Sequence, residues 1–442
     1  MKFRLQVLGF VIITTSLYLF FLTSCKKKPD NGDPGWTDKT MDQLIIERVF
    51  NWSATQDVNV TVEALDNAGN HLPFVRFDIY SESLSAGGYK VFSGTTYRNG
   101  NFETMITLPV TAEYLTIATQ YNGQNVEQKA AILDKAIHAV FAGLIPDTTR
   151  LDSDWDGVPD IFDDYPLDTL KAFNSYFPGE NQFATLIFED SWPATGDFDF
   201  NDMVIRYRIN LVTDFLNHVN RISILFIPEA SGTKMHNGFG FRLLLDTSFF
   251  AHVTGARLNT GLIDVDEKGF EKDQKKATVI AFDDALALYG TSWVEGPVNT
   301  DRNSLFLKPD TVVLTIDFKK SVAIPIAMFG TPPYNPFIFV NGDRAKEIHL
   351  PDFSPTDKAD ITLFGTYSDN SNPAIYRFYK SRNNLPWALF LPVGLIYLDE
   401  GDVINKGYLK FNDWAESSGK TYPDWYKNTS AGYRNPAVLY SH

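Results

Sequence analysis

Residues 58–65 read Val-Asn-Val-Thr-Val-Glu-Ala-Leu, with an apolar side chain at nearly every second position. Successive side chains of a β-strand point to opposite faces, so this period of two predicts a half-buried strand. The alternation recurs at residues 75–80, and an Asn-Gly pair at residues 99–100 is a strong hairpin signal. Residues 45–146 are therefore predicted to form a small β-sandwich of about seven short strands, of immunoglobulin-like or transthyretin-like type.

The C-terminal part of the chain, residues 171–442, also has the texture of a β-protein. Short apolar runs alternate with loops that contain glycine, proline and asparagine, and helical periodicity is confined to residues 283–288 and 408–416. The strand candidates are residues 185–188, 203–209, 222–227, 240–245, 278–282, 311–318 and 338–340. We predict a large jelly-roll-like β-sandwich, so that the whole chain is all-β.

Composition is that of a folded, acidic protein. The chain has 442 residues, of which 44% are hydrophobic, and this excludes general disorder. Its net charge of −15 argues against nucleic acid as a partner and is compatible with bound cations. Cys25 is the single cysteine, so no disulfide can form within the chain.

The first 25 residues predict an exported lipoprotein. Lys2 and Arg4 precede an uncharged apolar stretch that ends in Leu-Thr-Ser directly before Cys25. A basic start, an apolar core and small residues at the cleavage point are typical of a signal peptide. The ending resembles a bacterial lipobox, in which the cysteine carries the lipid. The alternative is an uncleaved transmembrane helix, because about 20 apolar residues can span a bilayer; the position of the single cysteine favours the lipoprotein.

This interpretation gives the N-terminal organisation. We expect residues 1–24 to be a removed signal peptide and residues 25–44 to be the lipidated cysteine followed by a flexible tether. The protein is then bound to a membrane through its lipid anchor, and the outer membrane is the expected location. The sequence leaves open whether it faces the periplasm or the cell surface.

An aspartate-rich segment, residues 147–170, separates the two predicted sandwiches. Its oxygen donors have the spacing of a calcium loop, with a glycine at position 6 for the sharp turn: Asp152, Asp154, Asp156, Val158 (through its carbonyl), Asp160 and Asp163. The spacing resembles a thrombospondin type 3 calcium repeat. The alternative is a solvated acidic linker. If calcium binds, its removal should loosen the joint, because the carboxylates then repel one another.

A second oxygen-rich row follows within residues 188–202. If this segment is extended, Asp197, Asp199 and Asn201 point to one side, and Phe198 and Phe200 point into the core. The candidate ligands of a second metal site are Glu189, Asp190, Asp197, Asp199, Asn201 and Asp202. A network of Asx turns that caps strand ends explains the same residues equally well. A pair of glycosidase carboxylates is a third, less favoured interpretation.

The aspartate-rich repeat followed by Phe-Glu-Asp-Ser-Trp-Pro at residues 188–193 and Gly-Asp-Phe-Asp-Phe-Asn-Asp at residues 196–202 resembles the LruC-domain lipoproteins of Bacteroidetes and Leptospira. Later segments agree with this resemblance, at residues 335–338, 346–351, 384–389, 414–419 and 424–426. The resemblance covers about residues 150–442. It implies a surface or secreted lipoprotein and carries over no catalytic residues.

The favoured function is that of a non-enzymatic envelope lipoprotein with a calcium-stabilised head. Such a head would bind a glycan or an envelope or host protein, or serve a structural role. The alternative is a polysaccharide-acting enzyme, a glycoside hydrolase or lyase, because a jelly-roll scaffold can host either function. His349 and three tryptophans, Trp387, Trp414 and Trp425, are predicted to be core residues rather than ligand-binding ones.

Overall fold

The computed structural model describes residues 39–121, 124–145, 151–290 and 295–441, which belong to one compact unit. The predicted signal peptide and the predicted lipidation site at Cys25 lie outside the described residues. Within the described ranges, no helix has the length and apolar character needed to cross a membrane.

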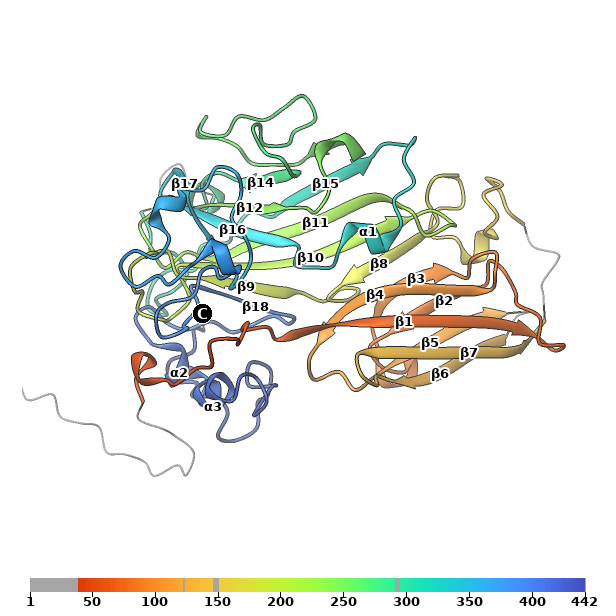
Figure 1. Cartoon of the computed structure of the whole chain (residues 1–442), viewed down its shortest axis with the longest axis horizontal. Helices are drawn as coiled ribbons and strands as arrows, with labels where there is room; N and C mark the ends of the chain where they lie inside the picture. Colours follow the sequence, from red (N-terminus) through yellow and green to blue (C-terminus); the bar gives the residue numbers. More distant parts are fainter. Residues whose placement is uncertain (1–38, 122–123, 146–150, 291–294, 442) are drawn as a thin grey trace, which may run out of the picture. The chain divides into compact units, whose positions relative to one another are not determined.

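The small sandwich consists of two sheets around one core (Figure 1), with strand orders β4-β1-β7 and β3-β2-β5-β6. The alternation at residues 58–65 is observed, since Val58, Val60, Val62 and Ala64 are all buried in β1. In the first sheet, β1 pairs antiparallel with β4 and parallel with β7. The strands are β1 (Thr55–Asp66), β2 (Arg76–Tyr80), β3 (Lys90–Thr95), β4 (Asn101–Pro109), β5 (Tyr114–Tyr121), β6 (Gln124–Ala131) and β7 (Ala136–Leu144).

The large domain packs a seven-stranded sheet against a four-stranded one. The first has the order β13-β15-β11-β10-β9-β18, with β8 also paired to β10, and the second has the order β14-β12-β16-β17. Their strands are β8 (Phe173–Phe177), β9 (Ala184–Phe188), β10 (Met203–Thr213), β11 (Val219–Ala230), β12 (Gly238–Arg242), β13 (Phe250–Thr254), β14 (Thr278–Phe282), β15 (Val312–Phe318), β16 (Asn335–Val340), β17 (Asp343–His349) and β18 (Ala388–Leu391). Aromatic rings fill the space between the sheets, as where Phe226 meets Phe239 edge-on at 5.0 Å.

The all-β prediction is confirmed. The α-helices are limited to the short α1 (Ile326–Phe329), α2 (Ile404–Gly407) and α3 (Phe411–Glu416) among the described residues. The candidate helix at residues 283–288 is only a 3-10 turn, Leu286–Leu288, whereas the candidate at 408–416 contains α3. Further 3-10 turns are Met41–Gln43, Leu84–Ala86, Asp160–Phe162, Thr247–Phe249, Ile361–Leu363 and Pro373–Ile375.

The other face of the seven-stranded sheet is covered by the C-terminal layer, which we define as residues 395–440. Ile187 of β9, Val204 of β10 and Leu389 of β18 share a second core with this layer. Its centre is made of aromatic side chains, among which Trp414 and Trp425 are fully buried with ring centroids 5.2 Å apart. The seven-stranded sheet is therefore buried on both faces where β9 and β18 lie.

The first described residues pack on this C-terminal layer (Figure 1). In this N-terminal strap, residues 39–54, Lys39 forms an ion pair with Glu416 at 2.8 Å, and the indole N–H of Trp52 donates to the carbonyl of Asn384 at 2.8 Å. The sequence predicts a tether up to residue 44 and the small sandwich from residue 45. The strap instead makes its contacts with the large domain and leads into β1.

The two sandwiches are joined by hydrogen bonds as well as by the chain. The amide of Ser93 in β3 donates to the hydroxyl of Ser175 in β8 at 3.1 Å. The amide of Thr95 donates to the side-chain oxygen of Asn217 at 3.0 Å, and the amide of that asparagine donates back to the carbonyl of Thr95. These buried contacts lie beside the aspartate-rich segment, which connects the two domains.

Candidate metal centres

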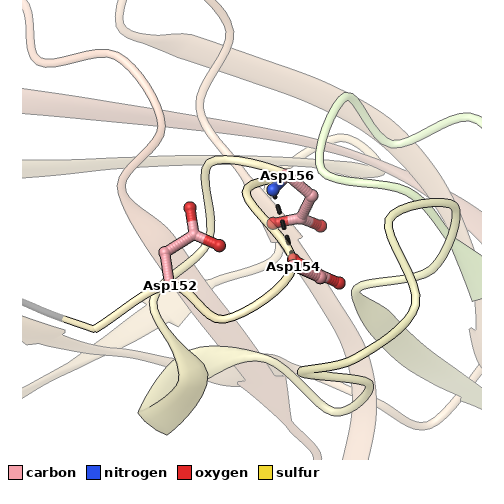
Figure 2. Close-up of side chains that lie close together, drawn as sticks. All are labelled: Asp152, Asp154 and Asp156. Carbon is pink, nitrogen blue, oxygen red and sulfur yellow. Dashed lines mark hydrogen bonds between the residues drawn. The ribbon is translucent and has the colours of Figure 1, made fainter.

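The aspartate-rich loop gathers three of its carboxylates. Asp152, Asp154 and Asp156 each place one oxygen within 4.8 Å of the others. Figure 2 shows the three side chains on one curled segment, with the amide of Asp156 donating to Oδ1 of Asp154 at 3.2 Å. Gly157 has a φ of +105°, a conformation that residues with a Cβ rarely adopt, so the turn at this position favours glycine.

Burial makes this group of acids electrostatically unfavourable without a cation. Burial, reinforced by nearby carboxylates, raises the pKa of Asp156 to about 6 and that of Asp163 to about 7, although backbone amides oppose the shift. Oδ2 of Asp154, Asp156 and Asp163 has no hydrogen-bond partner among the described residues. Carboxylate oxygens of this kind are the ligands that calcium prefers.

The predicted ligands do not all meet. Asp163 lies close enough to Asp154 and Asp156 for their charges to raise its pKa. Asp160 instead accepts hydrogen bonds from the amide and hydroxyl of Ser153, at 2.7 and 2.6 Å. The side chain of Val158 is buried in a small apolar cluster with Ala172 and Phe173. The structure thus groups Asp152, Asp154 and Asp156, and it directs the carboxylate of Asp160 toward Ser153 of the same loop.

The second candidate group also forms a carboxylate cluster. Glu189, Asp197 and Asp199 each place one oxygen within 4.8 Å of the others. Glu189 follows β9 and has no exposed surface; its Oε1 accepts the amide of Phe200 at 2.8 Å, whereas its Oε2 has no partner among the described residues. Gly196 makes room for this carboxylate, because a Cβ there would lie 1.7 Å from Oε2 of Glu189.

The segment that carries this cluster is not extended, which corrects the geometry expected from the sequence. Phe198 and Phe200 have φ angles of +65° and +55°, in the left-handed region that bulky residues seldom occupy. Phe200 is buried and Phe198 only partly so; Asp199 is buried, whereas Asp197 is exposed. The curled backbone therefore folds the two aspartates against Glu189 instead of placing them in a straight row.

The remaining predicted ligands of this group are held in separate interactions. Oδ2 of Asp202 accepts the amide of Asp190 at 2.8 Å, and Oδ2 of Asp190 accepts the side-chain amide of Asn237 at 2.9 Å. The side chain of Asn201 is fully buried and donates to the carbonyl of Leu398 at 3.2 Å. Oδ1 of Asn201 has no partner among the described residues.

Glu400 belongs to the same region and was missed by the sequence analysis. A Cβ added to Gly232 would lie 2.0 Å from Oδ1 of Asn201 and 2.8 Å from Oε2 of Glu400, so these two oxygens lie together. The charge of Asp197 contributes to raising the pKa of Glu400, after burial. The acidic turn at residues 399–402 was a signal in the sequence, but nothing local connects it to residues 189–202.

The charges in this region are strongly coupled. Burial, followed by the charges of Asp202, Asp199 and Asp197, raises the pKa of Glu189. Burial and the charge of Asp197 raise the pKa of Asp199 to about 7, and burial with the charge of Asp190 raises that of Asp202 to about 9. Each shift marks a carboxylate whose negative charge is unfavourable unless a cation or a proton compensates it.

The structure also has a cleft of about 700 Å³ where the strap, the small sandwich and the large domain meet. Most of its charged side chains have partners within the chain. Arg242 donates to the carbonyl of Pro355 and the hydroxyl of Ser354, both at 2.6 Å, and Asp352 forms an ion pair with Lys380 at 2.6 Å. These bonds hold the surrounding loops in place.

The predicted core residues are buried. Trp387, Trp414 and Trp425 are at most 2% exposed, so they offer no platform for a sugar ring. His349 is fully buried, with its ring nitrogens 2.6 Å from Oδ1 of Asn335 and 2.9 Å from Oε2 of Glu347. The interpretation of these residues as structural is confirmed.

Two domain families match parts of the chain, and both are described as domains of unknown function. DUF8469 matches residues 56–141, within the small sandwich, and DUF4842 matches residues 217–426, within the large domain and the C-terminal layer. The chain has no match among curated proteins.

One solved structure shares the fold over most of the chain. A candidate lipoprotein from Bacteroides ovatus is similar, with a TM-score of 0.55 and 15% identity, over 83% of this chain and 100% of that chain. The major pilin subunit of Bacillus cereus aligns over 64% of each chain with 10% identity and a TM-score of 0.16, which is too low to indicate a shared fold. The first similarity shows a common β-rich architecture and extends to most of this chain.

Proposed function

We propose that the chain is an exported lipoprotein of the LruC-domain type, anchored to the outer membrane through Cys25, whose calcium-stabilised head has a binding or structural role. The anchor is supported by the signal-peptide pattern that ends at Cys25. The fold shared with a candidate lipoprotein from Bacteroides ovatus agrees with it.

The observation that carries the calcium role is the position of the aspartate-rich loop, because it contacts both sandwiches. From the small sandwich, the guanidinium of Arg76 donates to the carbonyl of Phe162 and forms an ion pair with Asp164 at 3.3 Å. From the large domain, the ring of Phe215 lies 3.8 Å from the position of a Cβ on Gly157. An ion held by this loop would therefore stiffen the joint between the domains.

The expected size of the effect is modest. Extracellular calcium modules bind the ion with dissociation constants of roughly 10⁻⁴–10⁻³ M. A ligand that binds only the folded state stabilises it by RT ln(1 + [L]/Kd), which is about 0.4–1.4 kcal/mol at millimolar calcium. The loop would thus stabilise the joint only when calcium is bound, and it would not be the main source of the protein's stability.

A binding or structural role is favoured over catalysis. Arg242 and Asp352 of the large cleft are held by hydrogen bonds and an ion pair within the chain. Trp387, Trp414 and Trp425 are buried, so they cannot stack on a sugar ring. A glycan or an envelope or host protein remains the proposed ligand class, and it would bind to the outer surface of the head.

The anchor is tested by expressing the wild type and Cys25→Ser in a bacterium that processes lipoproteins, with radioactive palmitate. We expect label and membrane association in the wild type and neither in the variant; equal labelling would exclude Cys25 as the lipidation site.

The joint is tested on the lipid-free chain from residue 26 by limited proteolysis. Calcium should slow cleavage within residues 147–170 relative to EDTA. An equal rate of cleavage would show that calcium does not stiffen the joint between the two sandwiches. A glycan array on the same protein tests the ligand class.

A further inference from the structure

We propose that Glu189, Asp197 and Asp199 form a second calcium site, inside the large domain, which fastens the C-terminal layer to the seven-stranded sheet. This site is independent of the aspartate-rich loop, since it draws on other residues and lies between other elements. Its three carboxylates come from the end of β9 and from the curled segment that leads into β10.

The buried oxygen of Glu189 points to a ligand. Oε2 is fully buried, has no hydrogen-bond partner among the described residues and faces a glycine that leaves space for it. A buried ionised carboxylate with one oxygen left without a partner is strongly unfavourable, so its charge must be compensated. The neighbouring charges are those of Asp197, Asp199 and Asp202, which make the need greater.

The Asx-turn alternative accounts for part of the cluster only. Asp199 accepts the amides of Asn201 and Gly401, at 3.0 and 2.9 Å, so both of its oxygens have backbone partners. Asp202 is likewise explained by its bond from the amide of Asp190. Turn formation does not explain why Oε2 of Glu189 is left unpaired, or why the exposed Asp197 is folded against two other carboxylates.

The donor chemistry selects calcium. The three ligands that the cluster offers are carboxylates, and hard cations such as calcium and magnesium prefer oxygen donors. Calcium accepts several carboxylates in irregular geometry, whereas magnesium requires near-ideal octahedral geometry and keeps several waters. Asn201 adds a further buried oxygen without a partner, next to Glu400, at the edge of the same region.

The site lies where the sheet meets the start of the C-terminal layer. The amide of Gly401 donates to Asp199, the amide of Ile404 donates to the carbonyl of Phe198 at 2.8 Å, and Asn201 donates to the carbonyl of Leu398. Residues 197–201 therefore hold residues 398–404. A bound cation would hold the carboxylates together and so stabilise this attachment.

The test counts ions per chain. The lipid-free chain from residue 26 is stripped with EDTA and dialysed to equilibrium against millimolar calcium, and the calcium on the protein side in excess of that in the buffer is measured by elemental mass spectrometry. We expect two calcium ions in the wild type, one in Glu189→Gln, one in Asp154→Asn/Asp156→Asn and none in the combined variant. Glu267→Gln, an exposed acid elsewhere in the large domain, is the matched control and should keep two.

Each outcome separates the two sites. If Glu189→Gln and Asp197→Asn keep the wild-type calcium content, the second site is refuted. If the wild type holds a single ion that only the loop variant loses, the second site is again refuted and the proposed joint stands. If that single ion is lost only in Glu189→Gln, the joint fails and this site stands. If Glu189→Gln does not fold, the calcium content of Asp197→Asn decides whether the second site exists, because Asp197 is exposed and its substitution should not disturb folding.

Attachment of the layer is read out by hydrogen exchange. In the Asp154→Asn/Asp156→Asn background, calcium should slow amide exchange at residues 398–416 relative to EDTA, and Glu189→Gln should remove that protection. If exchange there does not change with calcium, the ion does not fasten the layer, and that part of the inference is overturned. Excess magnesium should leave most of the calcium bound; replacement by magnesium at equal concentration would contradict the assignment to calcium.

Discussion

Trp52, just before the first strand, packs edge-on against Trp414 in α3, with ring centroids 5.6 Å apart. Phe50 meets the same indole at 5.2 Å, also edge-on. These contacts join the beginning and the end of the described chain. Residues 39–54, which lead into β1, are therefore held by the large domain.

Removing the tryptophan of the strap should destabilise the large domain. Trp52→Ala removes a buried ring and a hydrogen bond to Asn384, so we expect a loss of about 3–5 kcal/mol in the free energy of unfolding, measured by urea denaturation. Lys39→Ala should cost at most about 1 kcal/mol, because its ion pair with Glu416 is partly exposed. Equal effects of the two changes would show that the strap is not docked as described.

Mutations can distinguish the aspartates that the aspartate-rich loop gathers from Asp160, which bonds to Ser153. Asp154→Asn/Asp156→Asn should abolish most of the loop's contribution to calcium-induced stabilisation in calorimetry, because these carboxylates are gathered in the structure. Asp160→Asn should retain more of it, since Asp160 is bonded to Ser153. If Asp160→Asn abolishes the loop's contribution as completely as the double change, calcium rearranges the loop to the ligand set predicted from its spacing.

Gly196 is a steric test of the carboxylate cluster. In Gly196→Ala the new methyl would lie 1.7 Å from Oε2 of Glu189, so something must move, and we expect a loss of about 1–3 kcal/mol by urea denaturation. Gly394→Ala is the control, because its nearest contact is an ordinary 3.9 Å to the side chain of Arg206. A neutral Gly196→Ala would mean that Glu189 can leave its buried position without cost.

A buried ion network should account for most of the stability that the four-stranded sheet loses at acid pH. Arg344 joins Glu271 and Glu347, which are both buried. Burial opposes ionisation of Glu347, but His349, Arg344 and Thr356 outweigh it and lower its pKa to about 2. A lowered folded pKa gives stability that is present above the ordinary value of 4.5 and is lost as the pH falls toward 2.

Glu347→Gln should therefore cost about 3–5 kcal/mol at neutral pH, because it removes one of the two carboxylates that compensate the buried guanidinium of Arg344. The difference from the wild type should shrink as the pH falls from 4.5 toward 2, in urea titrations at several pH values. Glu267→Gln, which is exposed, should show no such trend. If the difference in the free energy of unfolding between the wild type and Glu347→Gln does not change with pH, Glu347 is not the titrating group.

Two physical causes explain three of the strands that the sequence analysis missed, β8, β13 and β18. All four residues of β18 and all five residues of β9 are buried, because the C-terminal layer covers the face of the sheet that would otherwise be exposed to solvent. A strand buried on both faces loses its polar alternation, and short strands such as β8 and β13 offer few residues over which a period can be recognised. The predicted β9 was recognised as a short apolar run between turn signals.

The sequence by itself determined what depends on near neighbours: the strand alternation of residues 58–65, the fold class and the ligand spacing of residues 152–163. Only the tertiary structure decided that Trp52 meets Trp414, that Glu400 joins the region of Asn201, and that the backbone at Phe198 and Phe200 curls two aspartates onto Glu189. The reason is that local patterns report the face on which a side chain lies. Which distant residues share that face depends on how sheets and layers stack, and no short window of sequence contains that information.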